Sequence, residues 1–513
     1  MNSDTCVHTC VNAPSPPVHG NPALPIPFQF NKLPIHLRSN SHHPCYTHLA
    51  MTTRAEHLLN HALRYATPCC SREGLPCALV PLTPFAHDLL PVHSVVFRDW
   101  LADTFHREHE LIPSLFQLRT ALQLFEAKAR RSELSRESIA LRLSHRGQPP
   151  DPVAVLIDLC NSVGDAIEIT AAGWQVISTA RRAFRRSRSQ QPLPAPAEPG
   201  AISPSSLLFP PAALAWLVST LRPTGPYPIL LVKGPAASGK TMLARMLRSL
   251  IDPAISAFCP RPRTERDVMR LAWNNYVLAF DHSGDLPPAV LAALCRLSSG
   301  ASFEFDQSAY AADSLSILLQ RPIILTASDD GASAAKDAAV ANHAITIELP
   351  HIAAPQRRTE SEILLEFEGA RPALLATACT AVSRALGNVS RTSPEFPTRF
   401  ADALQWSIAS APALGISESQ MRIALCPDTL AREVAAFAHE KHYWEGSPSE
   451  LLAALQAAHV LDLPNSPERL TRRLHQAPLS TLGVTLETFR TTKHRKIRMT
   501  LAARSGVIKT QCA

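Results

Sequence analysis

The stretch from Ile229 to Pro253 constrains the fold of this chain more than any other. It reads ILLVKGPAASGKTMLARMLRSLIDP: an apolar strand, a loop bounded by two glycines, and a helix with leucines on one face. The loop fits the pattern G-x-x-x-x-G-K-[ST] in the strand–loop–helix context that this motif requires. The stretch therefore predicts a site for the phosphates of a nucleoside triphosphate at the end of a buried strand.

Each residue type in the loop suits that chemistry. Gly234 and Gly239 allow the backbone to curl so that its N–H groups point at phosphate oxygens. Lys240 is expected to reach the β- and γ-phosphates of ATP, and Thr241 is expected to offer its hydroxyl to Mg²⁺. The predicted nucleotide-contacting residues are Gly234, Pro235, Ala236, Ala237, Ser238, Gly239, Lys240, Thr241 and Met242.

Two further strands end in residues that fit the same site. The apolar run 275–280 ends at Asp281, which is typical of a Walker B acid that holds Mg²⁺ beside the loop threonine. The run 322–325 ends at Thr326, the place of a sensor residue, and this strand is expected between the other two in the sheet. The predicted catalytic residues are Lys240, Asp281 and Thr326, and the predicted Mg²⁺ ligands are Thr241 and Asp281.

Strands that alternate with helices predict a parallel, helix-flanked sheet with its ligand at the carboxyl edge. The expected fold class is α/β: a P-loop ATPase core, a mixed α+β N-terminal domain, a helical lid and a C-terminal winged-helix-like domain. The expected boundaries are 1–50 for a disordered or non-native extension, 51–189 for the N-terminal domain, 190–211 for a Pro-rich linker, 212–355 for the ATPase core, 356–446 for the lid and 447–513 for the basic DNA-binding domain.

Residues 1–50 leave two interpretations open, a disordered tail or upstream sequence ahead of a true start at Met51. The second is favoured because an amphipathic helix pattern begins there. Residues 51–189 are expected to hold helices at 97–105 and 115–129, followed by strands at 139–143, 153–159, 166–169 and 173–177. Asp158 lies in one of these strands, where a lone acid is more often a structural hydrogen-bond acceptor.

The composition limits the partners and the cellular location that can be expected of the protein. The 513 residues are 46% hydrophobic and 18% charged, with a formal net charge of +7, which permits a nucleic-acid partner without requiring one. No run of 18 apolar residues and no secretory signal is visible, so no membrane span is expected. Twelve cysteines are scattered without a regular framework, which favours reduced thiols and a cytoplasmic location.

Two basic segments are candidates for contact with DNA. The run from Arg181 to Arg188 holds five arginines around one phenylalanine, and is equally consistent with a solvated charge run and with phosphate contacts. Near the C-terminus, helices at 450–458 and 466–476 precede two strand-like runs at 484–490 and 496–501, which resembles a winged helix. Residues 484–513 carry seven lysines and arginines against Glu487, a balance that favours DNA over a frayed basic tail.

Five runs in the chain carry a family resemblance: GPAASGKT, NNYVLAFD, LPPAVLAALCRLSSG, RPIILTAS and AITIELP. In this order and at these distances they resemble the ATP-binding proteins of phages, plasmids and integrated elements of bacteria. Those proteins are P-loop ATPases similar to AAA+ and superfamily-3-like replicative helicases. The resemblance covers about residues 88–500. It implies ATP-driven work on single-stranded or fork-like DNA by a homo-oligomeric ring, with other replication proteins among its partners.

The sequence departs from that family at several places. Thr326 stands where a polar amide is usual, and His343 stands where an arginine usually reaches a neighbour's γ-phosphate. Residues 303–306 are acidic where a basic residue is usual, and His282 takes the place of a glutamate directly after Asp281. An arginine finger contributes about 10³–10⁵ in rate, so these departures predict weak hydrolysis. The remaining basic candidates near the site are Arg296 and Arg321.

Three functions therefore remain. The first is a helicase-like or translocase-like ATPase of mobile-element replication. The second is an ATP-binding, DNA-binding switch with weak or no hydrolysis. A small-molecule kinase ranks last, because a kinase would need an arginine-bearing lid over a phosphate acceptor and no basic C-terminal appendage.

Overall fold

The fold comes from a computed structural model. It describes residues 54–501 apart from 72–73, 82–86, 133–139, 148–153, 179–183, 199–208, 307–313, 329–337, 394–398, 427, 459, 461–462 and 491–494. The interpretations of residues 1–50 and of Met51 lie outside the described residues.

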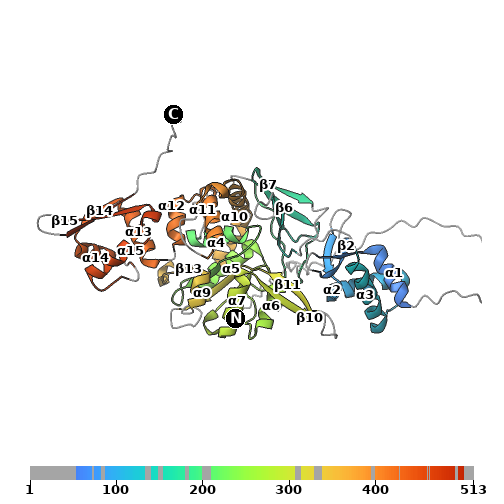
Figure 1. The fold of residues 1–513 in the computed structure, drawn as a ribbon. Coiled ribbons are helices and arrows are strands. Elements are labelled where there is room, and N and C mark those ends of the chain that lie inside the picture. The colour runs from blue at the N-terminus through green and yellow to red at the C-terminus, as the bar shows by residue number, and fades with distance from the viewer. Residues whose placement is uncertain are drawn as a thin grey trace, which may run out of the picture. The chain divides into compact units, whose positions relative to one another are not determined.

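Residues 229–348 contain a four-stranded parallel sheet, which is drawn among helices in Figure 1. Its order is β13-β8-β12-β9, and every neighbouring pair runs parallel. The strands are β8 (Ile229–Lys233), β9 (Leu278–Phe280), β12 (Ile323–Ala327) and β13 (Ala344–Glu348). The predicted place of the 322–325 strand, between the loop strand and the Asp281 strand, is confirmed.

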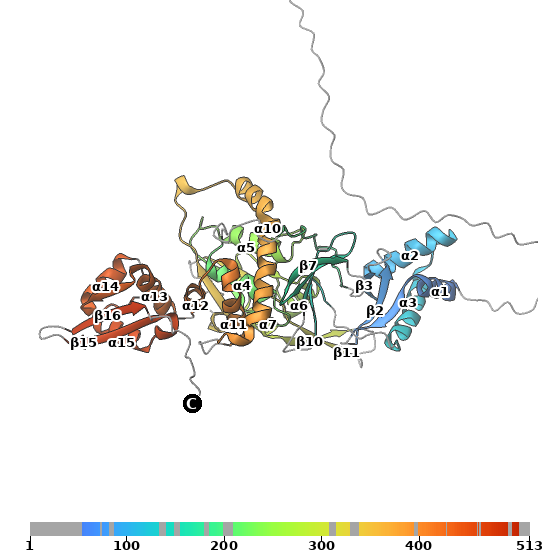
Figure 2. The same cartoon turned by 90° about the horizontal axis from the view of Figure 1, so that it is seen from above.

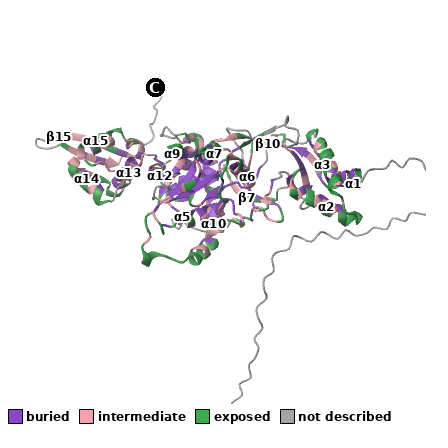
Figure 3. Ribbon diagram, turned by 90° about the horizontal axis from the view of Figure 1, so that it is seen from below, coloured by how far each residue is buried: buried purple, intermediate pink, exposed green. Residues whose placement is uncertain are grey.

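The central sheet has a hydrophobic core on each of its two faces. Successive side chains along a strand point to opposite faces, so alternate residues belong to different cores. Leu230 and Val232 pack into one hydrophobic cluster with the helices α4, α5, α10 and α11. Ile229 and Leu231 pack into a second cluster with α6 and α7. Figure 3 shows the buried residues concentrated around this sheet. Both faces are covered, which is why these strands read as continuous apolar runs.

The helices of this central region agree well with the sequence pattern. They are α4 (Pro211–Thr220), α5 (Lys240–Ile251), α6 (Glu265–Asn274), α7 (Pro288–Ser299), α9 (Ala338–His343), α10 (Glu360–Asn388), α11 (Ala401–Ser410) and α12 (Glu418–Leu425). The sequence predicts helices at 212–221, 288–297, 360–388 and 400–412, and the structure confirms these four. The sequence missed α6 and an antiparallel hairpin of β10 (Ala301–Asp306) and β11 (Ser314–Leu319).

Two antiparallel sheets precede the central one. The first, in the order β1-β2-β3, packs with α1, α2 and α3. Its elements are α1 (Arg54–Tyr65), β1 (Thr67–Cys70), β2 (Pro76–Pro81), β3 (His87–Pro91), α2 (Val95–His109) and α3 (Leu115–Arg130). The second contains β4 (Leu143–Arg146), β5 (Ala154–Asp158), β6 (Asp165–Thr170) and β7 (Gly173–Ser178). Both predicted helices and three of the four predicted strands are confirmed, and the first sheet was not predicted.

The strand expected at 139–143 is wrong in position, since β4 begins only at Leu143. Arg142 lies in the bend before it, with its guanidinium buried against Asp252. Asp158 at the end of β5 is buried and accepts hydrogen bonds from Arg186 and from the N–H of Cys160. The structural interpretation of this acid is therefore correct.

The described part of the expected linker is packed against the core. Leu193 is buried, and its N–H donates to the carbonyl of Leu159. Gln190 forms an isolated β-bridge with Ala254. Residues 190–198 therefore pack as part of the surrounding structure instead of forming a free connector.

The C-terminal unit is a three-stranded antiparallel sheet in the order β14-β16-β15, covered by helices. Its elements are α13 (Thr429–Lys441), β14 (Tyr443–Gly446), α14 (Pro448–Ala457), α15 (Pro467–Gln476), β15 (Val484–Arg490) and β16 (Arg495–Leu501). Helices α13 and α14 contact the sheet and α15 packs on α14 (Figure 2). The expected boundary at residue 447 falls inside this unit, because β14 pairs with β16.

None of the described helices combines the length and the apolar composition that crossing a bilayer requires.

Candidate functional site

The loop between β8 and α5 has the backbone that its glycines make possible. Gly239 has a φ of 84° and Gly234 a φ of 148°, a region that side chains disfavour. A Cβ atom on Gly234 would lie 2.4 Å from the carbonyl oxygen of Leu349, just after β13. The loop therefore approaches the end of the neighbouring strand too closely for any residue but glycine.

Lys240 folds back over this loop as the first residue of α5. Its Nζ donates to the carbonyl oxygens of Gly234 at 2.7 Å and Pro235 at 2.6 Å, and to the hydroxyl of Ser238 at 3.3 Å. These three acceptors hold the ammonium group at the centre of the loop. A cation in this place complements the charge of a phosphate group that reaches the helix N-terminus.

The predicted acid and the two predicted threonines meet at the carboxyl edge of the sheet. Oγ1 of Thr241 donates to the carboxylate of Asp281, at 3.1 Å from Oδ1 and 3.2 Å from Oδ2. The hydroxyl of Thr326 also donates to Oδ1 of Asp281 and accepts from the N–H of His282 at 3.1 Å. Hydroxyl and carboxylate oxygens at this spacing are the ligands that Mg²⁺ prefers. Thr241 and Asp281 thus fit a magnesium site.

A cavity of about 650 Å³ opens at the loop. Its lining includes the predicted residues Ala236 to Met242, together with Arg245, Phe258, His282 and Glu360. Arg245, one turn into α5, forms an ion pair with Glu360 at the start of α10. His351 Nδ1 lies 3.1 Å from the carbonyl oxygen of Ala236. The sequence interpretation missed Arg245, Glu360 and His351. Arg245 could have been predicted, because it lies one helical turn after the loop motif.

The three residues considered as substitutes for an arginine finger all have structural partners. Arg321 is half-buried, and its guanidinium donates to the carbonyl oxygens of Ala272 and Gln320. His343 is buried, with Nδ1 2.7 Å from the carbonyl oxygen of Ala339. Arg296 is exposed and pairs with Glu265 at 2.6 Å. Of these three residues, Arg296 is the most exposed.

The described arginines of the 181–188 run do not form a shared patch. Arg186 pairs with Asp158 at 2.9 Å and Arg188 pairs with Asp99 at 3.1 Å. Arg185 is buried, and its guanidinium lies 4.2 Å from the ring centroid of Trp273. The pKa of Arg185 is lowered to about 9, chiefly because burial disfavours the charged guanidinium.

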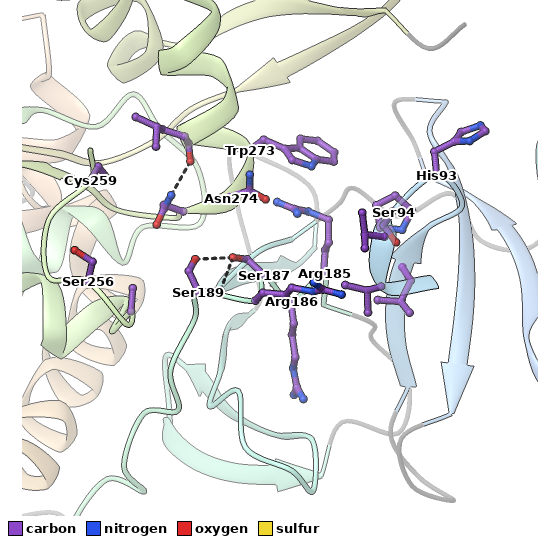
Figure 4. A pocket seen from close by; sticks show the side chains of 18 of the residues that line it. His93, Ser94, Arg185, Arg186, Ser187, Ser189, Ser256, Cys259, Trp273 and Asn274 are labelled. Carbon is purple, nitrogen blue, oxygen red and sulfur yellow. Dashed lines mark hydrogen bonds between the residues drawn. The ribbon is translucent and has the colours of Figure 1, made fainter. Parts of the chain in front are cut away.

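Arg185 lines one end of a second cavity, of about 760 Å³, which His93 and Ser94 also line. Figure 4 shows the Arg185 side chain reaching toward Trp273 and Asn274. Arg181 and Arg182 lie outside the described residues. Of the described arginines of the run, Arg185 is the one that is buried.

The C-terminal unit exposes part of its basic charge and neutralises another part. On α15, Leu470 and Leu474 are buried while Arg469 and Arg472 are exposed. On β16, Lys496 and Arg498 both donate to Glu445 of β14, each at 3.1 Å. The pKa of Glu445 is lowered to about 2. The largest cause is the hydrogen bond from the Tyr443 hydroxyl, followed by the hydrogen bonds from Lys496 and Arg498.

Among curated proteins, none matches the chain. The solved structures similar to it include the C-terminal region of NrS-1, with 8% sequence identity, a TM-score of 0.32, and coverage of 87% of this chain and 98% of that chain. They also include the JCV helicase, with 16% identity, a TM-score of 0.22, and coverage of 42% and 63%.

Two family models match successive parts of the chain. Residues 208–415 match the model described as actinomycete integrative conjugative element replication protein, AICE RepA. Residues 430–510 match the model of the AICE RepA C-terminal domain. The first match spans the central sheet and the helices α4 to α11, and the second spans nearly all of the C-terminal unit. Over more than half of its length, the chain is therefore similar, part by part and in the same order, to the replication protein RepA of actinomycete integrative conjugative elements.

Proposed function

We propose that this protein binds Mg·ATP at the 234–242 loop and uses it to act on DNA during replication of a mobile element. The observation that carries the proposal is the meeting of Thr241, Asp281 and Thr326 beside the Lys240 ammonium group at the carboxyl edge of a parallel sheet. This is where ligands bind in open α/β sheets. The similarity to a replication protein supports DNA as the second partner.

The geometry supports the following proposed roles. Lys240 neutralises phosphate charge, and the backbone N–H groups of the loop hold the phosphate oxygens. Thr241 and Asp281 hold Mg²⁺, which supplies charge stabilisation to phosphoryl transfer when bound. Thr326 orients the carboxylate of Asp281 through its hydroxyl. We also propose that the chain assembles into a homo-oligomeric ring and acts together with other replication proteins.

The test is ATP turnover by the purified chain with Mg²⁺, measured with and without single-stranded DNA. Turnover that DNA stimulates severalfold supports a helicase-like or translocase-like ATPase. A chain that binds neither Mg·ATP nor DNA under these conditions excludes the proposal.

The second candidate is an ATP-binding, DNA-binding switch with weak hydrolysis. It is favoured by the structural roles of Arg321 and His343 and by His282 in the place of a glutamate after Asp281. Tight Mg·ATP binding without turnover, together with a DNA affinity that ATP changes, would select this candidate over the motor. A small-molecule kinase remains the least favoured, because a kinase has no need of the exposed Arg469 and Arg472 of α15.

We propose that the C-terminal unit is a winged helix that binds DNA. Its order of strands and helices, with β14 before α14 and α15 and the β15–β16 hairpin after them, is that of a winged helix. Helix α15 would enter the major groove with Arg469 and Arg472 on its exposed face. The β15–β16 hairpin would contact the phosphate backbone.

Replacing Glu445 with glutamine is expected to tighten DNA binding by the full chain several-fold. The substitution removes the carboxylate that pairs with Lys496 and Arg498. Lys496 then becomes available to phosphates, and Arg498 keeps the longer pair with Glu487, at 3.4 Å. Each added phosphate contact steepens the dependence of log affinity on log salt by about 0.9 for duplex DNA. Binding to duplex DNA at several salt concentrations measures both effects.

The matched control for this substitution is Glu440→Gln on α13, where the glutamate pairs with Lys441. It makes the same change in net charge outside the sheet. Equal tightening in the two variants would attribute the effect to net charge and would contradict a DNA contact by β16.

Replacing Gly234 with alanine is expected to weaken Mg·ATP binding by about tenfold or more, because the methyl group would overlap the Leu349 carbonyl and displace the loop. Calorimetric titration with a non-hydrolysable ATP analogue measures the affinity. Gly369→Ala is the control, since a Cβ atom there meets nothing within 4 Å. An unchanged affinity in Gly234→Ala would show that the loop does not hold the phosphates in this conformation.

A further inference from the structure

Two histidines and a glutamate from different helices meet beside the N-terminal sheet. His61 lies on α1, and Glu108 and His109 lie in the last turn of α2. One ligand atom from each residue lies within 4.8 Å of the other two. Nδ1 of His61 is 3.2 Å from Oε2 of Glu108, and the two imidazole rings have centroids 5.4 Å apart. The proposed nucleotide and DNA sites use none of these residues.

The hydrogen bonds of His61 show which of its nitrogens carries the proton. Nε2 lies 3.1 Å from Oγ1 of Thr104, whose own hydrogen is directed at the carbonyl oxygen of Trp100, 2.8 Å away. A hydroxyl that donates elsewhere can only accept here, so Nε2–H is the donor and Nδ1 of the neutral ring presents a lone pair. The side chain is 2% exposed, and Nδ1 has no hydrogen-bond partner among the described residues.

A buried lone pair that faces a carboxylate oxygen is unfavourable unless a cation lies between them. A metal ion is one such cation, and a proton on Nδ1 is the other. In tetrahedral zinc sites, histidine nitrogen and carboxylate oxygen each lie about 2.0–2.2 Å from the ion, which places two ligand atoms about 3.4 Å apart. The observed 3.2 Å between Nδ1 and Oε2 is close to that separation.

Neighbouring side chains hold His61 and Glu108 in place, as hydrogen-bonding partners do for the ligands of a bound metal. Arg64 donates to Oε1 of Glu108 at 3.0 Å, the Tyr65 hydroxyl also bonds this carboxylate, and Oε2 faces Nδ1 of His61 at 3.2 Å. Thr104 accepts from the second nitrogen of His61, and such a partner fixes the ring of a metal-binding histidine. The last turn of α2 adds the negative end of the helix dipole, which favours a cation.

We propose that His61, Glu108 and His109 bind one zinc ion, with water as the fourth ligand, and that this ion joins α1 to α2. Two imidazoles and one carboxylate are a donor set that suits zinc over magnesium or calcium. The site belongs to the N-terminal region and does not depend on ATP.

Titration of the metal-free full chain with Zn²⁺ by calorimetry tests this site. The informative variants are Glu108→Gln and His109→Ala, because both side chains are exposed and their loss leaves the core intact. The control is His106→Ala, an exposed histidine in the same turn of α2 and outside the cluster. We expect both variants to bind zinc at least about tenfold more weakly than the wild type, and the control to match the wild type.

A second readout separates this site from the cysteines of the chain. Co²⁺ bound by imidazole and carboxylate gives visible ligand-field bands without thiolate charge-transfer absorption, and we expect these bands to be lost in His109→Ala. The proposal is overturned if the wild type binds no zinc, or if either variant binds it as tightly as the wild type does. In the first case, a proton on Nδ1 is the cation between His61 and Glu108.

Discussion

Replacing Lys240 with alanine is expected to reduce ATP turnover at least about 10²–10³-fold, to the background of the assay. Three oxygens of the loop hold the ammonium group at its centre, where the proposed nucleotide would place its phosphates. Removing one preorganised group that stabilises developing charge typically has an effect of about this size. The fold should survive, because Lys240 is half-exposed and lies outside the hydrophobic clusters. Turnover of radiolabelled ATP with Mg²⁺ measures the loss.

The control is Lys233→Ala, which removes a lysine at the end of β8 that does not line the loop cavity. It should keep turnover within about twofold of the wild type. Equal turnover in the Lys240 variant and the wild type would contradict the assignment of the loop. If the wild type itself does not turn over ATP, the same pair of variants is compared by Mg·ATP affinity. Loss of binding only in Lys240→Ala would then support the switch.

The sequence predicted the central sheet because its strands are covered on both faces. β8 and β12 are continuous apolar runs whose ends coincide with polar residues, so strand, loop and order could all be inferred. The first N-terminal sheet gave no such signal. Its strands read TPCC, PCALVP and HDLLP, and proline is disfavoured inside strands. Here tertiary packing against α1 and α3 outweighs local propensity.

The candidate site likewise contains residues that the sequence predicted and contacts that it could not predict. Asp281 directly follows β9, Thr326 lies near the end of β12, and Lys240 and Thr241 begin the helix after β8. These positions come together because the carboxyl ends of parallel strands meet at one edge of a sheet. The contact between Arg245 and Glu360 joins segments far apart in sequence, and no local pattern predicts it. The arginine run was ambiguous for the same reason, since its partners Asp158 and Asp99 come from separate elements.

Replacing Arg142 with alanine is expected to lower the free energy of unfolding by about 3–5 kcal/mol. The side chain is fully buried and donates to Asp252 at 3.1 Å, to the carbonyl of Asp158 at 2.8 Å and to the carbonyl of Gln191 at 3.0 Å. It joins the β4–β7 sheet, the 190–198 segment and the end of α5. Its loss leaves the buried carboxylate of Asp252 without a charged partner. Denaturant unfolding followed by tryptophan fluorescence measures the change.

Arg146→Ala is the control, because this arginine of β4 pairs with Glu168 at the surface, where such a pair contributes about 0–1 kcal/mol. The double variant Arg142→Met with Asp252→Asn separates charge from packing. Asparagine keeps an acceptor for the backbone N–H groups of Tyr276 and Val277, and methionine fills the volume without a charge. If the unpaired carboxylate causes the loss, the double variant should be more stable than Arg142→Ala. If the two are equally unstable, the hydrogen bonds of Arg142 to the two carbonyls hold these segments together, and the ion pair does not.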